Sequence, residues 1–286
     1  MPLRGDTASI DLNMRIRILH DTIYRYDRPV SGVIQTLRLM PRNHDSQYIS
    51  NWRVNISVDC PVACHIDAFG NNTHTFTADG PLEELVVHVE GMAEVEDTGG
   101  VVKGTMERFP PSLFLRETNL TEADDAIRSF AADFSSSDGH LTLLHNMLKA
   151  LHSEIIFDAD PTNTGTTAAE AFVLKRGVCQ DISHIFIAAA RSLGIPARYV
   201  SGYFHRADGV VEQEAGHAWT EAFIPDLGWV AFDPTNGISA TDAHLRVAVG
   251  LDYLSAAPVR GTRYGGSGEN LTVEIRVEQA MRQSQN

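Results

Sequence analysis

The chain has 286 residues with 23 basic and 37 acidic side chains, and it therefore carries a formal charge of −14. Because the basic residues form no run, this charge excludes a phosphate-binding surface for nucleic acid, and it disfavours contact with anionic lipid. Hydrophobic residues make up 43% and charged residues 21%, which is typical of a folded globular protein. No stretch reaches the ~18 apolar residues of a membrane-spanning helix.

The first 13 residues lack the apolar segment of an export signal, so we expect a cytoplasmic protein with a disordered extension over residues 1–13. The three cysteines agree with a reducing compartment, because a secreted scaffold shows a dense, paired set. Cys60 and Cys64 with His65 and His74 form a loose zinc pattern without a second CxxC. Ordinary thiols are the favoured interpretation, and we expect neither a metal nor a cofactor.

The first third of the chain predicts β-strands. Residues 14–26, 52–58 and 86–96 alternate between apolar and polar side chains. Clusters of Pro, Gly, Asn and Asp, which are typical of turns, separate these runs at residues 27–29, 41–43, 70–72 and 79–81. Short alternating strands with such turns favour a β-sandwich-like domain over residues 14–108.

Helical patterns follow the prolines at 110 and 111, and we place a second domain at residues 109–278 and a tail at 279–286. Residues 121–124 resemble a capping box for a helix that ends near Phe134, and residues 167–170 form a full capping box for a helix that ends near Lys175. Residues 141–156 have helical apolar spacing. His145 and His152 lie on that helix, but two histidines without a third ligand are more often surface or core residues.

One cysteine lies where a nucleophile would be useful. Gly177 predicts an N-cap, which places Cys179 in the first turn of a helix that ends at Gly194. The helix start offers unpaired N–H groups and positive partial charge, which favour a thiolate and can hold an oxyanion. Asp181 works against the thiolate. The thiol shares an apolar stripe with four residues: Ile182, Phe186, Ala189 and Leu193.

Residues 216–237 predict a β-hairpin that turns at Pro225-Asp226-Leu227-Gly228. A three-residue loop with a G1 bulge pairs residue 224 with residue 228. Asp233 is then opposite Trp219 and diagonal to His217, on a face that also carries Glu221 and Trp229. The other face carries small and apolar residues: Ala218, Ala222, Ile224, Val230 and Phe232.

If the first face receives the cysteine helix, the groups form a relay. Cys179 is the nucleophile, His217 moves its proton, and Asp233 orients the imidazole. A core cysteine, a strand histidine on a carbonyl and an aspartate that caps a turn are the ordinary alternatives for each residue taken alone. The three together, on these elements and in this order, favour catalysis.

These residues carry a resemblance to the transglutaminase-like superfamily, within the papain-type Cys-His-Asp hydrolases. The motifs are Gly177-Val178-Cys179-Gln180-Asp181, Gly194-Ile195-Pro196-Ala197-Arg198, His217-Ala218-Trp219 and Asp233-Pro234-Thr235-Asn236. Residues 37–42, 67–71 and 252–266 resemble further segments of bacterial members that carry an N-terminal β domain. The resemblance implies an α+β fold, with a β-sandwich-like domain followed by a core in which a cysteine-bearing helix packs on an antiparallel sheet.

The resemblance also implies a triad of Cys179, His217 and Asp233, thioester formation from an amide, and no metal. Gln180 is a candidate oxyanion donor and Trp219 a candidate substrate contact. Many relatives have a tyrosine where this chain has the segment that begins with Phe157. We expect a cysteine amidase or protease that acts on a peptide or protein at peptide or isopeptide bonds. Acyl transfer to a primary amine is the alternative, and a non-catalytic peptide-binding module is the second. The oligomeric state stays open.

Overall fold

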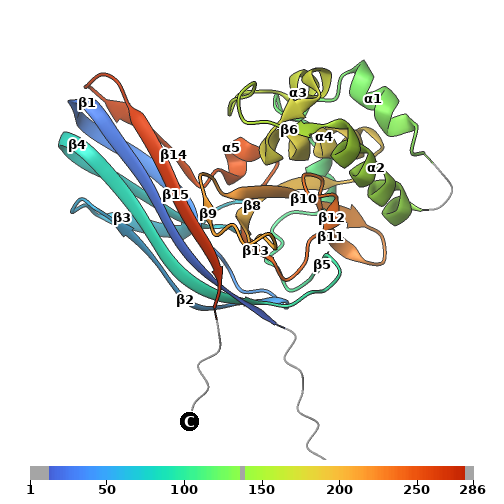
Figure 1. Cartoon of the computed structure of the whole chain (residues 1–286), viewed down its shortest axis with the longest axis horizontal. Coiled ribbons are helices and arrows are strands. Elements are labelled where there is room, and N and C mark those ends of the chain that lie inside the picture. Colours follow the sequence, from blue (N-terminus) through green and yellow to red (C-terminus); the bar gives the residue numbers. More distant parts are fainter. Residues whose placement is uncertain (1–12, 136–138, 281–286) are drawn as a thin grey trace, which may run out of the picture.

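The computed structural model describes residues 13–135 and 139–280; residues 1–12 of the predicted extension and 281–286 of the predicted tail lie outside the described residues. Two antiparallel sheets dominate the structure, and the longer helices gather on one side of the second sheet, away from the first sheet (Figure 1). The first sheet contains β1 (Met14–Met40), β2 (Gln47–Ile56), β3 (Val62–Ile66), β4 (Asn72–Val95), β9 (Glu212–Gln213), β14 (Val259–Tyr264) and β15 (Asn270–Gln279).

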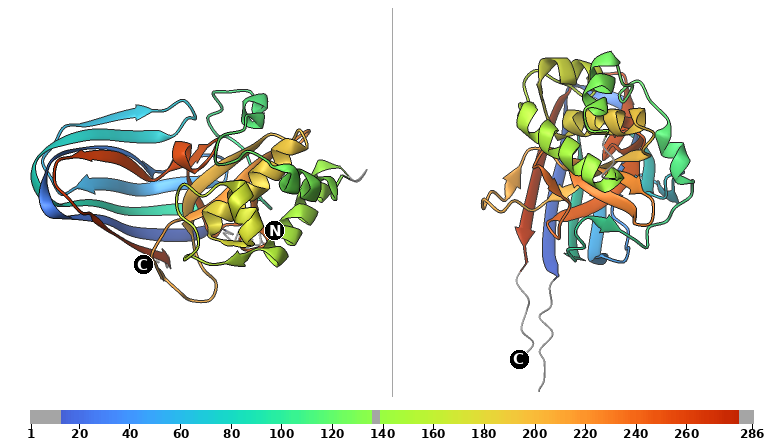
Figure 2. Two further views of the ribbon diagram at one scale, coloured as in Figure 1. Left: turned by 90° about the horizontal axis from the view of Figure 1, so that it is seen from above. Right: turned by 90° about the vertical axis from the view of Figure 1, so that its right-hand side faces the viewer.

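The first sheet is built on two very long strands. β1 has 27 residues and β4 has 24, and each is interrupted by a register shift rather than by a turn. The clusters at 27–29 and 79–81 lie at these shifts, so the prediction that they separate strands is wrong. The sheet curls back on itself there (Figure 2), and Val33 and Leu37 share a core with Leu85 and Val87. The two layers of the sandwich-like region are therefore halves of one bent sheet.

The C-terminal end of the chain returns to the first sheet. β14 and β15 both pair with β1. The short strand β9 then pairs with β15 at the edge of the sheet. The proposed division near residue 109 stays a prediction, and the first sheet takes strands from both sides of it.

The second sheet has the strand order β12-β11-β10-β8-β13, and β5 pairs with β11. Its strands are β5 (Val101–Val102), β8 (Ala197–Phe204), β10 (His217–Ile224), β11 (Gly228–Asp233), β12 (Ile238–Ser239) and β13 (His244–Gly250). A separate parallel pair consists of β6 (Ile156–Phe157) and β7 (Arg176–Gly177), which lie between β5 and β8 in the sequence. The expected α+β class, with an N-terminal β region and a helix packed on an antiparallel sheet, is confirmed.

The helices surround one central helix. They are the short 3-10 helix η1 (Pro111–Leu115) and α1 (Asp125–Ala132), α2 (His140–Glu154), α3 (Ala168–Leu174), α4 (Cys179–Ser192) and α5 (Tyr253–Ala256). α4 is buried along nearly its whole length between the sheet and α1, α2 and α3. None of the helices within residues 13–135 and 139–280 is long and apolar enough to cross a membrane.

Of the three helices predicted between residues 121 and 175, two start as expected. Thr167 and Glu170 form the capping box of α3, and α2 follows the predicted apolar spacing. α1, however, is capped by Asp124, which accepts from Ile127 N at 2.8 Å. Thr121 does not cap it, because its hydroxyl is taken by the buried guanidinium of Arg191 at 2.6 Å. The tertiary contact therefore overrides the local capping pattern.

Candidate active site

Cys179 lies in the first turn of its helix, as predicted, but the helix begins at Cys179 itself and its N-cap is Val178 and not Gly177. Asp181 Oδ2 accepts the Val178 N–H at 2.9 Å and closes the first turn. Gly177 packs against that carboxylate, since a Cβ at this position would lie 2.7 Å from Asp181 Oδ2. Burial raises the pKa of Asp181, while the bond from Val178 lowers it. The carboxylate is thus part of the turn that presents the partly buried thiol.

The predicted hairpin register is confirmed, because Ile224 pairs with Gly228 and Thr220 pairs with Phe232. The expectation that the cysteine helix packs on the hairpin face that carries His217 is wrong. α4 packs on the small and apolar face, through Ala218, Ala222, Ile224, Val230 and Phe232. The imidazole meets the thiol for another reason: His217 is the first residue of β10 and Cys179 is the first residue of α4. The two side chains meet at the end of the layers and not between them.

His217 connects the thiol to the carboxylate. Its Nε2 lies 2.7 Å from Asp233 Oδ2, so Nδ1 is the nitrogen left to face Cys179, which lies close enough to raise the pKa of the imidazole. Only 11% of the His217 side chain and none of the Asp233 side chain is exposed. The structure therefore places His217 in contact with Asp233 and beside Cys179, while the roles of the three residues stay a prediction.

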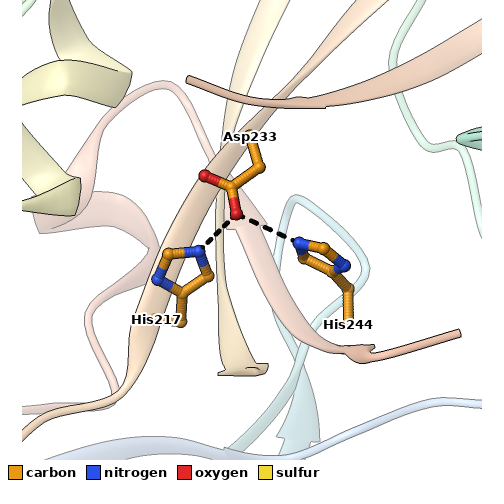
Figure 3. A group of neighbouring side chains, drawn as sticks. All are labelled: His217, Asp233 and His244. Atoms are coloured by element: carbon orange, nitrogen blue, oxygen red, sulfur yellow. Dashed lines mark hydrogen bonds and ion pairs between the residues drawn. The ribbon is translucent and has the colours of Figure 1, made fainter. Parts of the chain in front are cut away.

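Asp233 accepts hydrogen bonds at both carboxylate oxygens. Oδ2 accepts from His217 and from His244 Nε2 at 3.1 Å (Figure 3). It also accepts from Asn236 Nδ2 at 2.6 Å. Oδ1 accepts the main-chain N–H groups of Thr235 and Asn236, each at 3.1 Å. This network explains why an aspartate can remain ionised in a fully buried place.

Sequence reasoning missed His244 as part of this site. It lies at the start of β13, next to no recognised motif, and only the pairing of β13 with β8 brings it to Asp233. Asn236 belongs to a quoted motif, and its place three residues after Asp233 is the signal that could have shown it capping the carboxylate.

The two histidines and the carboxylate have the composition of a metal site, and their possible ligand atoms lie within 4.8 Å of one another. The hydrogen bonding of His244 argues against that use. Its Nδ1 accepts the Thr241 N–H at 3.0 Å, so its Nε2 carries the proton and donates to Asp233. A nitrogen that donates a proton has no lone pair for a metal, and His244 is best described as an orienting donor.

Opposing effects set the protonation of the pair. Burial alone lowers the pKa of His217, but the charge of Asp233, its hydrogen bond and the Cys179 thiol together raise it to about 10. Burial alone raises the pKa of Asp233, but the charge of His217 and the bonds from both histidines hold it well below its usual range. At neutral pH the His217–Asp233 pair is therefore an imidazolium and a carboxylate, and Cys179 lies beside the imidazolium.

The remaining candidates are placed less favourably. Trp219 is 2% exposed and lies in a cluster with Val200, Ala231 and Val249, so it has no surface for a substrate. Gln180 is buried, and its side chain reaches only Thr164 O, at 3.5 Å. The group that Gln180 can offer to an oxyanion is therefore its main-chain N–H at the start of the helix.

Phe157 lies on β6 and pairs with Gly177 of β7, and Gly177 is two residues before Cys179 in the sequence. Its side chain is 61% exposed, so it lies at the surface of this part of the molecule. Three large aromatic residues of the second sheet (Trp229, Tyr199 and Tyr203) are core residues and offer no surface to a substrate.

The other cysteines and histidines have separate surroundings. Cys60 is half-buried and Cys64 is exposed on β3, and neither belongs to any group of metal-ligating side chains within residues 13–135 and 139–280. On α2, His145 bonds Ser239 Oγ at 3.1 Å, and His152 bonds Thr235 O at 2.9 Å. They tie α2 to the loops around β12 and do not form a site together.

Known proteins resemble all or part of this chain. An uncharacterised protein of Mycobacterium leprae is 28% identical over 277 residues, which cover 92% of this chain and 98% of that protein. A protein-glutamine gamma-glutamyltransferase of Pseudomonas aeruginosa is 30% identical over 131 residues, which cover 40% of this chain and 19% of that protein.

A solved structure has the same fold. The crystal structure of a candidate cysteine protease from Cytophaga hutchinsonii superposes with a TM-score of 0.77 at 18% identity, over 96% of this chain and 93% of that one. At this identity the likeness speaks for the fold alone.

Two family descriptions match the sequence in succession. Residues 16–94 match the bacterial transglutaminase-like N-terminal region, and residues 128–234 match the transglutaminase-like superfamily core. The second match includes Cys179, His217 and Asp233, and ends one residue after the carboxylate. The chain therefore belongs to the transglutaminase-like superfamily, with the bacterial N-terminal region ahead of its core.

Proposed function

We propose that this protein is a cysteine-dependent enzyme that cleaves an amide bond through a thioester. The observation that carries the proposal is the position of His217, between the Cys179 thiol and a buried carboxylate that accepts five hydrogen bonds. A non-catalytic binding module gains nothing from an ionised carboxylate that must be kept buried at a cost in free energy.

The first half of the reaction forms the acyl-enzyme. The Cys179 thiolate attacks the amide carbonyl carbon, and the oxyanion is held by main-chain N–H groups at the start of α4. Collapse of the tetrahedral intermediate breaks the C–N bond. The His217 imidazolium gives its proton to the leaving nitrogen, and a thioester and a free amine or ammonia result.

The second half returns the enzyme to its starting state. His217, now neutral, takes a proton from water, which attacks the thioester and releases a carboxylic acid. Attack by a primary amine instead gives a new amide, and the acceptor alone separates hydrolysis from transfer. We propose hydrolysis of a peptide or isopeptide bond in a peptide or protein substrate, in the cytoplasm. The similarity to a protein-glutamine gamma-glutamyltransferase supports transfer as the second candidate.

Thiol reactivity tests the proposal without knowledge of the substrate. Cys64 is an exposed thiol in the same chain and serves as an internal reference. We expect iodoacetamide to label Cys179 at least tenfold faster than Cys64 at pH 6, and we expect His217→Ala to abolish the difference. Equal labelling of the two thiols in the wild type would refute a thiolate–imidazolium pair.

A second assay separates hydrolysis from transfer. The protein is incubated with a library of glutamine-containing peptides, with and without a primary amine, and ammonia release and product mass are measured. Hydrolysis gives a carboxylic acid in both mixtures, whereas transfer gives an adduct that contains the amine. Cys179→Ala is the inactive control, and Cys64→Ser is the matched cysteine variant that should remain active.

A further inference from the structure

The edge of the second sheet is closed by side chains of the first sheet. β13 is the outer strand of the second sheet, and it contacts β1 and β4 of the first. An outer strand normally leaves main-chain N–H and C=O groups unpaired along its free edge. Two side-chain amides of the first sheet take the places of a further strand here.

Gln47, the first residue of β2, makes the first of these contacts. Its Oε1 accepts the Arg246 N–H at 2.8 Å, and its Nε2 donates to Arg246 O at 2.9 Å. The second proton of Nε2 goes to Arg42 O at 2.9 Å. Gln47 is 2% exposed, so every polar group of a buried amide is used.

Asn71 repeats this arrangement at the other end of β13. Its Oδ1 accepts the Val249 N–H and its Nδ2 donates to Val249 O, both at 2.8 Å. The second proton of Nδ2 goes to Asp67 Oδ2 at 3.0 Å, and the same carboxylate accepts from Arg38. This accounts for residues 67–71, a segment that the sequence resemblance singled out and the mechanism does not use.

The position of the two contacts matters because of what β13 carries. The register of β13 against β8 shifts between Arg246 and Ala248, so the strand contains a bulge between the two clamped residues. His244 lies two residues before Arg246 and reaches Asp233 from there. Leu245 and Val247 also pack in a cluster with Ile16 and Ile18 of β1. The first sheet therefore fixes the position of β13, and β13 in turn positions His244, which donates to Asp233.

We propose that the first sheet is a working part of the active site, and that Gln47 and Asn71 are positioning residues that act on Asp233 through β13 and His244. This inference rests on the proposed function. The charged or titratable groups that face the His217 imidazole are Cys179 from α4, Asp233 from β11 and His244 from β13. A shift of β13 would move His244 and so change its bond to Asp233, whereas Cys179 and Asp233 would keep their positions on α4 and β11.

The test compares two buried glutamines of the first sheet. Gln47→Leu removes both bonds to Arg246, whereas Gln35→Leu changes a glutamine that is 5% exposed, lies opposite Gly261 of β14 and has no partner at Oε1. The rate of Cys179 alkylation by iodoacetamide is measured from pH 5 to pH 9 in the full chain, with folding checked by circular dichroism. We expect Gln47→Leu to slow alkylation at pH 6 by roughly tenfold, within the range that misplacement by an ångström costs, and Gln35→Leu to leave the profile unchanged.

A double variant decides the route. If Gln47 acts through His244, Gln47→Leu slows alkylation much less when combined with His244→Phe than it does alone. Additive losses, an unchanged rate in Gln47→Leu, or an equal loss in Gln35→Leu would each overturn the inference. Asn71→Ser is the milder variant should Gln47→Leu fail to fold. Failure of the proposed function gives a different result, because wild-type Cys179 would then react no faster than Cys64.

Discussion

His244 donates its Nε2 proton to Asp233 Oδ2 at 3.1 Å, the same oxygen that His217 contacts at 2.7 Å. The tautomer of His244 is fixed by the Thr241 N–H, so its proton always points at the carboxylate. The aspartate is therefore oriented by a second imidazole that the thiol never contacts.

Replacement of His244 should lower the activity without abolishing it. His244→Phe keeps a ring on Phe204 and Trp219 but removes one donor to a charged acceptor, a bond worth about 1.5–3 kcal/mol. We expect kcat/KM on an amide substrate to fall by roughly tenfold, measured against His88→Phe in the first sheet as a control. Activity equal to wild type would show that the bond does not matter.

The stability that the His217–Asp233 pair contributes should depend on pH in a defined direction. The pKa of His217 is raised to about 10 from the ordinary value of 6.5, so its contribution is complete below pH 6.5 and is lost as the pH rises through 10. The pKa of Asp233 is lowered, so its contribution is present above its ordinary range and is lost in acid.

We therefore expect the melting-temperature difference between wild type and His217→Ala to be largest near pH 5–6 and to shrink towards pH 10.5. Differential scanning fluorimetry at five pH values measures it, with His152→Ala as a control on a histidine that bonds a carbonyl. A difference that is constant over this range contradicts the raised pKa of His217.

A methyl group at Gly177 should disturb the nucleophile from outside the triad. Gly177→Ala places a Cβ 2.7 Å from the Asp181 carboxylate that closes the first turn of α4. Overpacking of this kind costs about 1–3 kcal/mol. We expect lower stability to urea and slower alkylation of Cys179, whereas Gly165→Ala, with one contact at 3.3 Å, should be nearly neutral.

Glu221 should be far more important for stability than for chemistry. It is fully buried on β10 and accepts from Arg198 Nε at 2.6 Å and Arg246 Nε at 2.7 Å. Burial would raise its pKa, but the two guanidinium groups lower it to about 2. Glu221→Leu leaves both cations without their shared partner, and we expect a loss of about 3–5 kcal/mol in urea unfolding.

The control for Glu221 is an ion pair at the surface. Glu84 contacts Arg25 at 2.8 Å with both side chains about half exposed, so Glu84→Leu should cost less than about 1 kcal/mol. Equal losses in the two variants would show that burial of the Glu221 network does not set its importance.

Local patterns predicted those parts of the site that depend on neighbouring residues. The hairpin register followed from the Pro-Asp-Leu-Gly turn, and the place of Cys179 in the first turn of α4 followed from Gly177 as an N-cap signal, with an error of one residue at the N-cap. The face on which α4 packs could not be deduced in this way, because that choice depends on the volumes of Ala218 and Ala222 against the helix.

The same limit explains what was missed. Pro29 and Pro81 are typical of turns, and only the pairing of β1 with β4 shows that they mark a bend inside continuous strands. Trp219 looked like a substrate contact because alternation places it on the face of His217, yet that face is covered by other elements. His244 is 27 residues from His217 in sequence, and no periodicity connects them.

The return of β15 to β1 has a consequence for how the protein folds. Ile16 to Arg25 at one end of the chain pair with residues 270–279 at the other, so this part of the sheet has the largest sequence separation that the fold offers. Contacts of this kind form late, because closure of the chain must precede them. During synthesis one edge of β1 therefore stays open until the residues of β15 have been made.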